Sequence, residues 1–143
     1  MTNQHESVTQ NDNQLQIVYV ENDYEAFHLV RIFLKDKYRL IMAKNEAEAE
    51  QKIDGKNTSL ILMDIALSKK DDGIELTKKI KASEDTKHIP IIALTAYAMK
   101  SDIERFSKAG MDGYITKPFS RKDLESKVEK LINSNIQTIT KVV

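Results

Sequence analysis

The sequence contains no cysteine, no excess of charge of either sign and no long apolar run. Without cysteine, neither a disulfide framework nor a thiolate metal site is possible. Because 22 lysine and arginine residues balance 22 aspartate and glutamate residues, the chain lacks the basic excess that a dedicated nucleic-acid binder normally carries. No apolar segment approaches the roughly 20 residues that a membrane-spanning helix needs, and the N-terminus lacks a signal-peptide core. We therefore expect a cytoplasmic protein with neither nucleic acid nor membrane as a partner.

What the 143 residues do contain is an alternation of short apolar runs and helical segments. Residues 1–14 are rich in Asn and Gln, which predicts a disordered leader. Apolar runs, several of them typical of parallel strands covered on both faces, follow at 15–20, 38–43, 59–65, 89–95 and 113–116. Five strands alternating with five helices predict a doubly wound α/β domain of the (βα)5 flavodoxin-like class, with a five-stranded parallel sheet. This domain is expected to span 15–135, leaving 136–143 as a C-terminal tail or linker stub.

Local signals mark where the predicted helices begin and end. Asn45-x-x-Glu48 and Ser101-x-x-Glu104 have the spacing of a capping box. Gly110 stands where a left-handed C-cap is expected. The last helix carries one apolar stripe, formed by Leu124, Val128, Leu131 and Ile132.

Polar residues follow the predicted strands. The first strand is followed by Glu21, Asn22 and Asp23, the third by Asp64, the fourth by Thr95 and the fifth by Lys117. Because right-handed crossovers bring the carboxyl ends of parallel strands to one edge of the sheet, we expect these side chains to share a cleft. Carboxylate and amide oxygens suit Mg²⁺, and an ammonium and a hydroxyl suit the oxygens of a phosphoryl group.

Each of these residues also has an ordinary structural explanation. Asn22-x-x-Glu25 fits a capping box, so the polar triplet could serve only to start a helix. Thr95 could be a β-branched strand residue and Lys117 a surface lysine. Asp64 is harder to explain, since an acid that ends an apolar strand is uncommon without a partner. Their combination at one edge favours a functional site.

Four stretches, "VENDYE", "LILMDIALSKKDDGIEL", "HIPIIALTAYAMK" and "GMDGYITKPFS", carry a family resemblance. In their order and spacing the chain resembles the receiver domain of bacterial two-component response regulators, the CheY-like superfamily, from about Leu15 to Asn133. The closest likeness is to stand-alone single-domain regulators and receivers of hybrid kinases. The implied function is a phosphoprotein of two-component signal transduction or phosphorelay, which is no enzyme beyond its own phosphorylation and dephosphorylation.

The resemblance implies that Asp64 is the phosphoacceptor, which would form an aspartyl phosphate with a phosphoryl group from a sensor histidine kinase or phosphotransfer protein. It implies Mg²⁺ as the cofactor, with ligands from Glu21, Asn22, Asp64 and the backbone carbonyl of Ala66. Lys117 corresponds to the lysine that pairs with Asp64 and then with the phosphoryl group.

The resemblance also implies how the signal would leave the site. Thr95 and Tyr114 correspond to a switch pair, Ala66 and Tyr97 to positions that tune the access of water, and Lys117-Pro118 to a cis peptide bond. A downstream protein is expected to bind the fourth helix, fifth strand and fifth helix, which are the helix near 99–109, the strand at 113–116 and the helix that follows.

One departure from the family pattern lies at Asn22, where the second member of the acidic pair is usually Asp. The loss of one negative charge predicts weakened Mg²⁺ affinity. It also leaves open an alternative, a pseudo-receiver that binds proteins without phosphorylation. The retained Asp64, Thr95, Tyr114 and Lys117 weigh against that alternative. A flavodoxin-like cofactor binder would need a phosphate-cradling loop after the first strand, and "ENDYEAF" contains no glycine.

Overall fold

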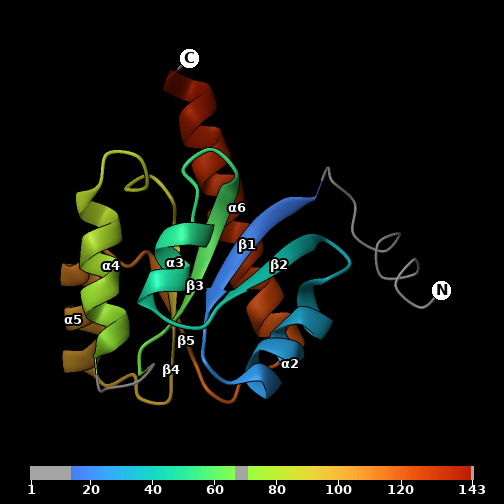
Figure 1. Ribbon diagram of the computed structural model, residues 1–143, viewed down its shortest axis with the longest axis vertical. Helices are drawn as coiled ribbons and strands as arrows, with labels where there is room; N and C mark the ends of the chain where they lie inside the picture. The colour runs from blue at the N-terminus through green and yellow to red at the C-terminus, as the bar shows by residue number, and fades with distance from the viewer. Residues whose placement is uncertain (1–13, 67–70, 143) are drawn as a thin grey trace.

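The computed structural model describes residues 14–66 and 71–142, so the predicted leader lies almost wholly outside the described residues. Within these ranges five strands and five helices alternate, which confirms the predicted order (Figure 1). The elements are β1 (Leu15–Val20), α2 (Tyr24–Leu34), β2 (Tyr38–Ala43), α3 (Glu46–Lys52), β3 (Thr58–Asp64), α4 (Asp72–Ala82), β4 (Ile91–Thr95), α5 (Lys100–Ala109), β5 (Gly113–Thr116) and α6 (Arg121–Val142).

The five described strands form one parallel sheet in the order β2-β1-β3-β4-β5. The chain first adds β2 on one side of β1 and then crosses back to place β3 on the other side. The strand order therefore reverses between β1 and β3, which is the topological switch point where sheets of this kind bind ligands at the carboxyl ends of their strands. Glu21 and Asp64 stand at the ends of these two strands.

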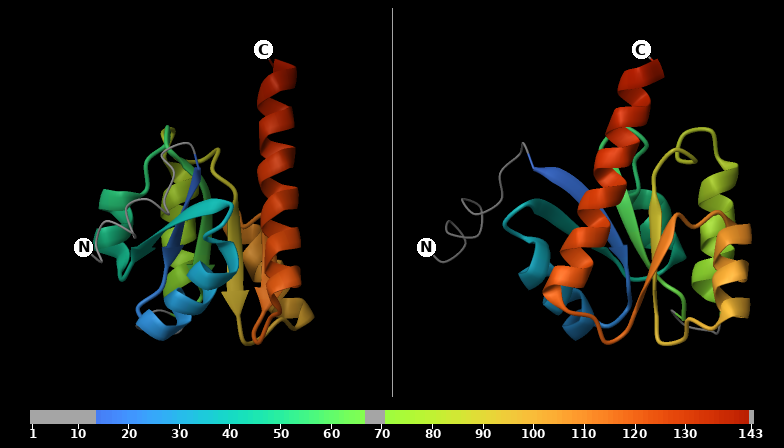
Figure 2. Two further views of the ribbon diagram at one scale, coloured as in Figure 1. Left: turned by 90° about the vertical axis from the view of Figure 1, so that its right-hand side faces the viewer. Right: turned by 180° about the vertical axis from the view of Figure 1, so that it is seen from behind.

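Alternate side chains of each strand enter two apolar layers on opposite faces of the sheet. Ile17 and Tyr19 of β1 pack in one layer with residues of α2 and α6. Val18 and Val20 pack in the other layer with residues of α3, α4 and α5. Figure 2 shows α6 and α4 on opposite sides of the sheet. Helices on both faces explain why the central strands β1, β3 and β4 are largely apolar rather than alternating.

Two of the predicted helix signals are confirmed. Asn45 caps α3 by accepting a hydrogen bond from the Glu48 amide at 2.9 Å, and the Glu48 carboxylate accepts one from the Lys44 amide at 2.9 Å. Gly110 ends α5 with a φ of 102°, the left-handed conformation expected of a glycine C-cap.

The capping box predicted at Ser101 is wrong, because α5 begins two residues earlier than that motif requires. Met99 is the N-cap residue, and the carboxylate of Asp102 accepts a hydrogen bond from its amide at 3.1 Å. Asp102 thus takes the N3 position, where its carboxylate can reach back to the cap.

The last helix buries the predicted stripe and then continues beyond the sheet. Leu124, Val128 and Ile132 are buried, and Leu131 packs partly against the same layer. Residues 136–142, where a tail or linker was expected, prolong α6 as helix to Val142. Figures 1 and 2 show this end of the helix projecting past the amino ends of the strands, on the side away from their arrowheads. The extent of the domain as 15–135 stays a prediction.

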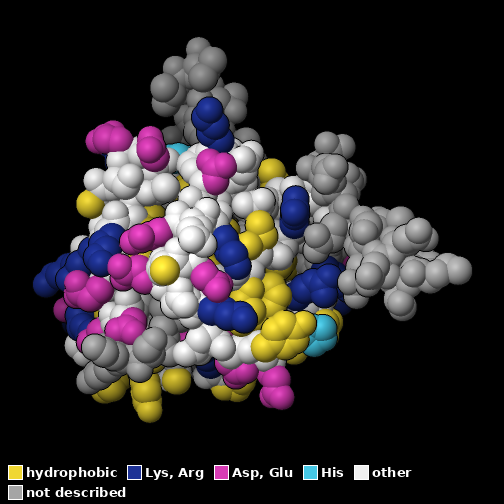
Figure 3. Space-filling view, viewed as in Figure 1, with side chains coloured by type: hydrophobic (Ala, Val, Ile, Leu, Met, Phe, Trp, Pro, Cys, Tyr) yellow, Lys and Arg dark blue, Asp and Glu magenta, His cyan; other side chains and the backbone are white. Residues whose placement is uncertain are grey.

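The surface over α3 and α4 mixes charges of both signs, as Figure 3 shows for one face. An ion pair of 2.7 Å between Lys79 and Glu46 links these two helices. None of the helices in the described ranges combines the length and the apolar character that crossing a bilayer requires.

The first turn of α4 lies directly against the end of β3, and Gly73 makes this approach possible. The Gly73 amide donates a hydrogen bond to the Ile65 carbonyl at 2.9 Å. A Cβ atom at Gly73 would lie 2.3 Å from the Asp64 carbonyl oxygen. A side chain would fit there only if the backbone of α4 or of β3 moved. Glycine at this position therefore lets α4 pack directly on the strand that carries Asp64.

Replacing Gly73 with Ala should lower the free energy of unfolding by about 1–3 kcal/mol, the usual cost of overpacking, although alanine favours helix. Urea denaturation followed by circular dichroism would measure the change. Gly113→Ala is the matched control, because a Cβ there would meet side-chain carbons no closer than 3.5 Å. Equal stabilities for the two variants would contradict this account of Gly73.

Candidate functional site

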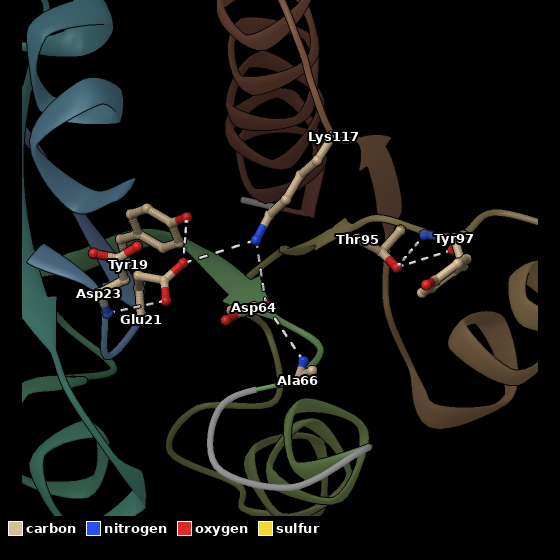
Figure 4. A network of polar contacts seen from close by, with 8 residues as sticks. All are labelled: Tyr19, Glu21, Asp23, Asp64, Ala66, Thr95, Tyr97 and Lys117. Carbon is tan, nitrogen blue, oxygen red and sulfur yellow. Dashed lines mark hydrogen bonds and ion pairs between the residues drawn. The ribbon is translucent and has the colours of Figure 1, made fainter. Parts of the chain in front are cut away.

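Three charged side chains meet where β1, β3 and β5 end. The Lys117 Nζ atom lies 3.5 Å from Asp64 Oδ1 and 3.8 Å from Glu21 Oε1. The Glu21 and Asp64 side chains are only 3% and 10% exposed, whereas Lys117 is 34% exposed. Figure 4 shows the ammonium group between the two carboxylates. The structure thus brings together the two acids and the lysine that the sequence placed at this edge.

Glu21 is held through both of its carboxylate oxygens. The hydroxyl of Tyr19 donates a hydrogen bond to Oε1 at 3.0 Å, and the amide of Asp23 donates one to Oε2 at 3.2 Å. Burial, together with the nearby charge of Asp64, raises the pKa of Glu21, and the Asp23 amide, Lys117 and Tyr19 oppose this rise. Burial and the neighbouring Glu21 raise the pKa of Tyr19 in turn, so its hydroxyl is a donor at neutral pH.

The three polar residues after β1 have different roles. Glu21 points into the site, whereas Asp23 is the N-cap of α2 and accepts a hydrogen bond from the Glu25 amide at 3.0 Å. The alternative in which Asn22 caps this helix, with Glu25 completing a capping box, is therefore off by one residue. Asn22 lies between them and is exposed.

Asp64 borders an open cleft of about 830 Å³, which Thr95, Tyr97 and Lys117 also line. The Asp64 Oδ1 atom accepts a hydrogen bond from the Ala66 amide at 3.3 Å, which fixes the turn after β3. This hydrogen bond places the Ala66 amide beside the Asp64 carboxylate. The Ala66 carbonyl as a metal ligand stays a prediction.

The Thr95 hydroxyl does not bond to Asp64 or Lys117. It donates to the Tyr97 carbonyl at 2.9 Å and accepts from the Tyr97 amide at 3.1 Å. The Tyr97 side chain is 74% exposed at the cleft. Tyr114, on the neighbouring strand β5, is half-buried, with Lys127 Nζ 6.0 Å from its ring centroid. The peptide bond between Lys117 and Pro118 is cis.

An arginine in this cleft and its acidic partner were not predicted from the sequence. Arg105 of α5 lines the cleft, and its guanidinium lies 2.7 Å from Asp71 and 3.5 Å from Asp102. The hydrogen bond to Asp71 raises the pKa of Arg105. Asp71 immediately precedes α4 and has a φ of 72°, a left-handed conformation uncommon outside glycine. Asp71 and Arg105 are far apart in the sequence and meet only because α5 lies beside the start of α4. No local sequence pattern could therefore have predicted this ion pair.

The donor atoms at this edge fit a hard cation. The described residues contain no group of three His, Cys, Asp or Glu side chains that could hold a metal ion. The predicted ligand set draws instead on the carboxylates of Glu21 and Asp64, the amide of Asn22 and a backbone carbonyl. Such an all-oxygen set suits Mg²⁺, which takes few protein ligands and keeps several waters. It does not suit zinc, which prefers nitrogen and sulfur.

Comparisons with known proteins agree with this geometry. Residues 17–129 match the family model of the response regulator receiver domain. The polar-differentiation response regulator DivK of Brucella anthropi is 43% identical over 105 residues, which are 73% of this chain and 85% of DivK. DivK of Brucella ovis is also 43% identical over 105 residues.

Solved structures show the same arrangement of elements. The CheY-like receiver domain protein of Methanospirillum hungatei has a TM-score of 0.78 at 25% identity, covering 88% of this chain and 99% of that one. The receiver domain of the sensor histidine kinase PA1611 from Pseudomonas aeruginosa has a TM-score of 0.72 at 31% identity, covering 84% and 98%. That structure has a magnesium ion coordinated in its active-site cleft. The present chain belongs to the response regulator receiver domain family, the phosphoryl-accepting domains of two-component signalling.

Proposed function

We propose that Asp64 accepts the phosphoryl group, donated by a phosphohistidine of a sensor kinase or phosphotransfer protein. The observation that carries this assignment is a buried carboxylate at the end of β3, 3.5 Å from the Lys117 ammonium and open to a cleft. A carboxylate oxygen of Asp64 would form a bond to phosphorus while the phosphorus–nitrogen bond breaks. The electron pair of that bond returns to the imidazole, which takes up a proton as it leaves.

Glu21, Asn22, Asp64 and the Ala66 carbonyl are the residues that would hold Mg²⁺. When bound, the cation would neutralise negative charge on the phosphoryl oxygens during transfer. The all-oxygen donor set and the magnesium in the PA1611 receiver support this assignment. The metal would bring positive charge to a site where two carboxylates share one ammonium group.

Lys117 and Thr95 would bind the transferred group. The ammonium of Lys117 already contacts Asp64 and can pair with a phosphoryl oxygen with little movement. The hydroxyl of Thr95 would first have to release the backbone of Tyr97. Its movement, followed by that of Tyr114, would alter the face formed by α5, β5 and α6, where a downstream protein would bind.

In this role the chain is a cytoplasmic signalling protein rather than an enzyme with turnover on a separate substrate. The pseudo-receiver remains the second candidate, and the observation that favours it is the neutral Asn22. The two candidates differ in whether Asp64 can be phosphorylated.

Incubation with acetyl phosphate and Mg²⁺ should add the mass of one phosphoryl group to the intact protein, and Asp64→Asn should abolish this adduct. Intact-protein mass spectrometry, with and without Mg²⁺, makes the measurement. Asp85→Asn, an exposed change in the loop after α4, should leave the adduct unchanged. Absence of an adduct at every Mg²⁺ concentration would favour the pseudo-receiver.

Asn22→Asp should tighten Mg²⁺ binding about tenfold, because it adds a negative ligand beside Glu21 and Asp64. Titration of backbone amide chemical shifts near Asp64 with MgCl₂ would give the affinity. Asn133→Asp adds the same charge on an exposed position of α6 and should have no effect. Equal affinities for Asn22→Asp and the unaltered protein would show that position 22 is not a ligand.

Tyr97→Ala should speed the loss of the phosphoryl group several-fold, because the exposed ring at the cleft would shield the phosphorus from water. The decay of the mass adduct after removal of the donor gives the rate. Tyr24 is also strongly exposed, at 64%, but it does not line the cleft, so Tyr24→Ala is the control. An unchanged rate in Tyr97→Ala would rule out shielding by this ring.

A further inference from the structure

We propose that Tyr19 is a positioning residue for the metal site, and that its buried hydroxyl holds Glu21 in the orientation that receives Mg²⁺. This inference rests on the proposed function, since it assigns to Tyr19 a role toward the same cation. Tyr19 does not enter the cleft and would touch neither the metal nor the phosphoryl group. It would act only through Glu21.

The first support is the position of Tyr19 in the core. Its side chain is only 1% exposed and lies in the apolar layer between the sheet and helices α2 and α6. Its ring packs 6.1 Å from that of Phe27. A hydroxyl in such a layer destabilises the fold unless it has a hydrogen-bond partner. Packing alone would be served equally well by phenylalanine, so the hydroxyl calls for a separate explanation.

The second support is the identity of the partner. Residues two apart in extended chain point to the same face. Glu21 directly follows β1, and its amide still donates to the Ala43 carbonyl at the end of β2, so the Tyr19 ring and the Glu21 carboxylate lie side by side. The hydroxyl donates to Glu21 Oε1 at 3.0 Å, the same atom that faces Lys117 at 3.8 Å. A buried tyrosine could bond to any backbone carbonyl, whereas this one bonds to a carboxylate of the site.

The third support is the way in which Glu21 is constrained. A glutamate has one more rotatable bond than an aspartate, so fixing it as a metal ligand costs more conformational entropy. Here Tyr19 fixes one oxygen and the Asp23 amide fixes the other, at 3.2 Å. Each carboxylate oxygen can accept more than one interaction, so both remain able to bind a cation. The hydrogen bonds thus fix the side chain before the metal arrives.

This constraint matters more in the present chain because Asn22 brings no charge. Glu21 and Asp64 are then the two carboxylates that the predicted ligand set retains. Hydrogen-bond partners behind metal ligands typically contribute 10–100-fold to metal affinity. The Tyr19 hydroxyl occupies this place behind Glu21.

The experiment compares Mg²⁺ affinities of the full chain and four variants by titration of amide chemical shifts. Tyr19→Phe keeps the ring and removes only the hydroxyl, and we expect Mg²⁺ binding about tenfold weaker. Tyr38→Phe makes the same change at another buried tyrosine, in β2 and 7% exposed, and should leave the affinity unchanged. Urea denaturation without metal would show whether both variants fold.

A double-mutant cycle tests whether Tyr19 acts through Glu21. Glu21→Gln should weaken Mg²⁺ binding, and adding Tyr19→Phe to it should cause little further loss, because the carboxylate to be positioned is gone. An unchanged affinity in Tyr19→Phe would overturn the positioning role while leaving the metal site standing. An equal loss on either background would overturn it too, since Tyr19 would then act independently of Glu21. Failure of the unaltered protein to bind Mg²⁺ would overturn the proposed metal site and the role of Tyr19 together.

Discussion

The contact of the Lys117 ammonium with both Glu21 and Asp64 is the interaction on which this edge of the molecule depends. Two buried carboxylates repel each other, and burying either without a partner costs several kcal/mol. Lys117 follows the edge strand β5, whereas Glu21 follows β1 and Asp64 ends β3. The ammonium reaches both carboxylates only when β1, β3, β4 and β5 are paired in this order. The site is thus a product of the whole sheet rather than of any one motif.

The apolar layers and the close packing at Gly73 supply the rigidity that this charge arrangement needs. The central strands β1, β3 and β4 are buried on both faces, so their ends cannot shift without opening the core. The first turn of α4 rests on the backbone of Asp64 and Ile65, and the ion pair between Asp71 and Arg105 joins the start of α4 to α5. The predicted phosphoacceptor is therefore attached directly to the helices that cover one face of the sheet.

The sequence was sufficient to predict the parallel sheet, because runs such as 59–65 have the apolar character that burial on both faces requires. It also placed Glu21, Asp64 and Lys117 at one edge, since strand direction alone decides this. The sequence misled where two helix starts are possible. At the start of α5 the carboxylate of Asp102, rather than that of Glu104, accepts the hydrogen bond from the N-cap residue. The sequence could not predict that Thr95 bonds to Tyr97 or that Arg105 bonds to Asp71, because these partners depend on loop conformation. Tyr19 was recognisable in principle, as a hydroxyl-bearing strand residue two positions before the acid that follows β1.

The double hydrogen bond of Thr95 has a consequence for the fidelity of a signal. Its hydroxyl uses both its donor and an acceptor position on the backbone of one residue, Tyr97. At about 0.5–1.5 kcal/mol for each net hydrogen bond, this closed turn favours the resting rotamer by about 1–3 kcal/mol, or 5–150-fold. Thermal fluctuation alone would then rarely turn the hydroxyl toward the cleft. In the proposed switch this bias would give a low background output, and phosphorylation would have to supply the energy that breaks the turn.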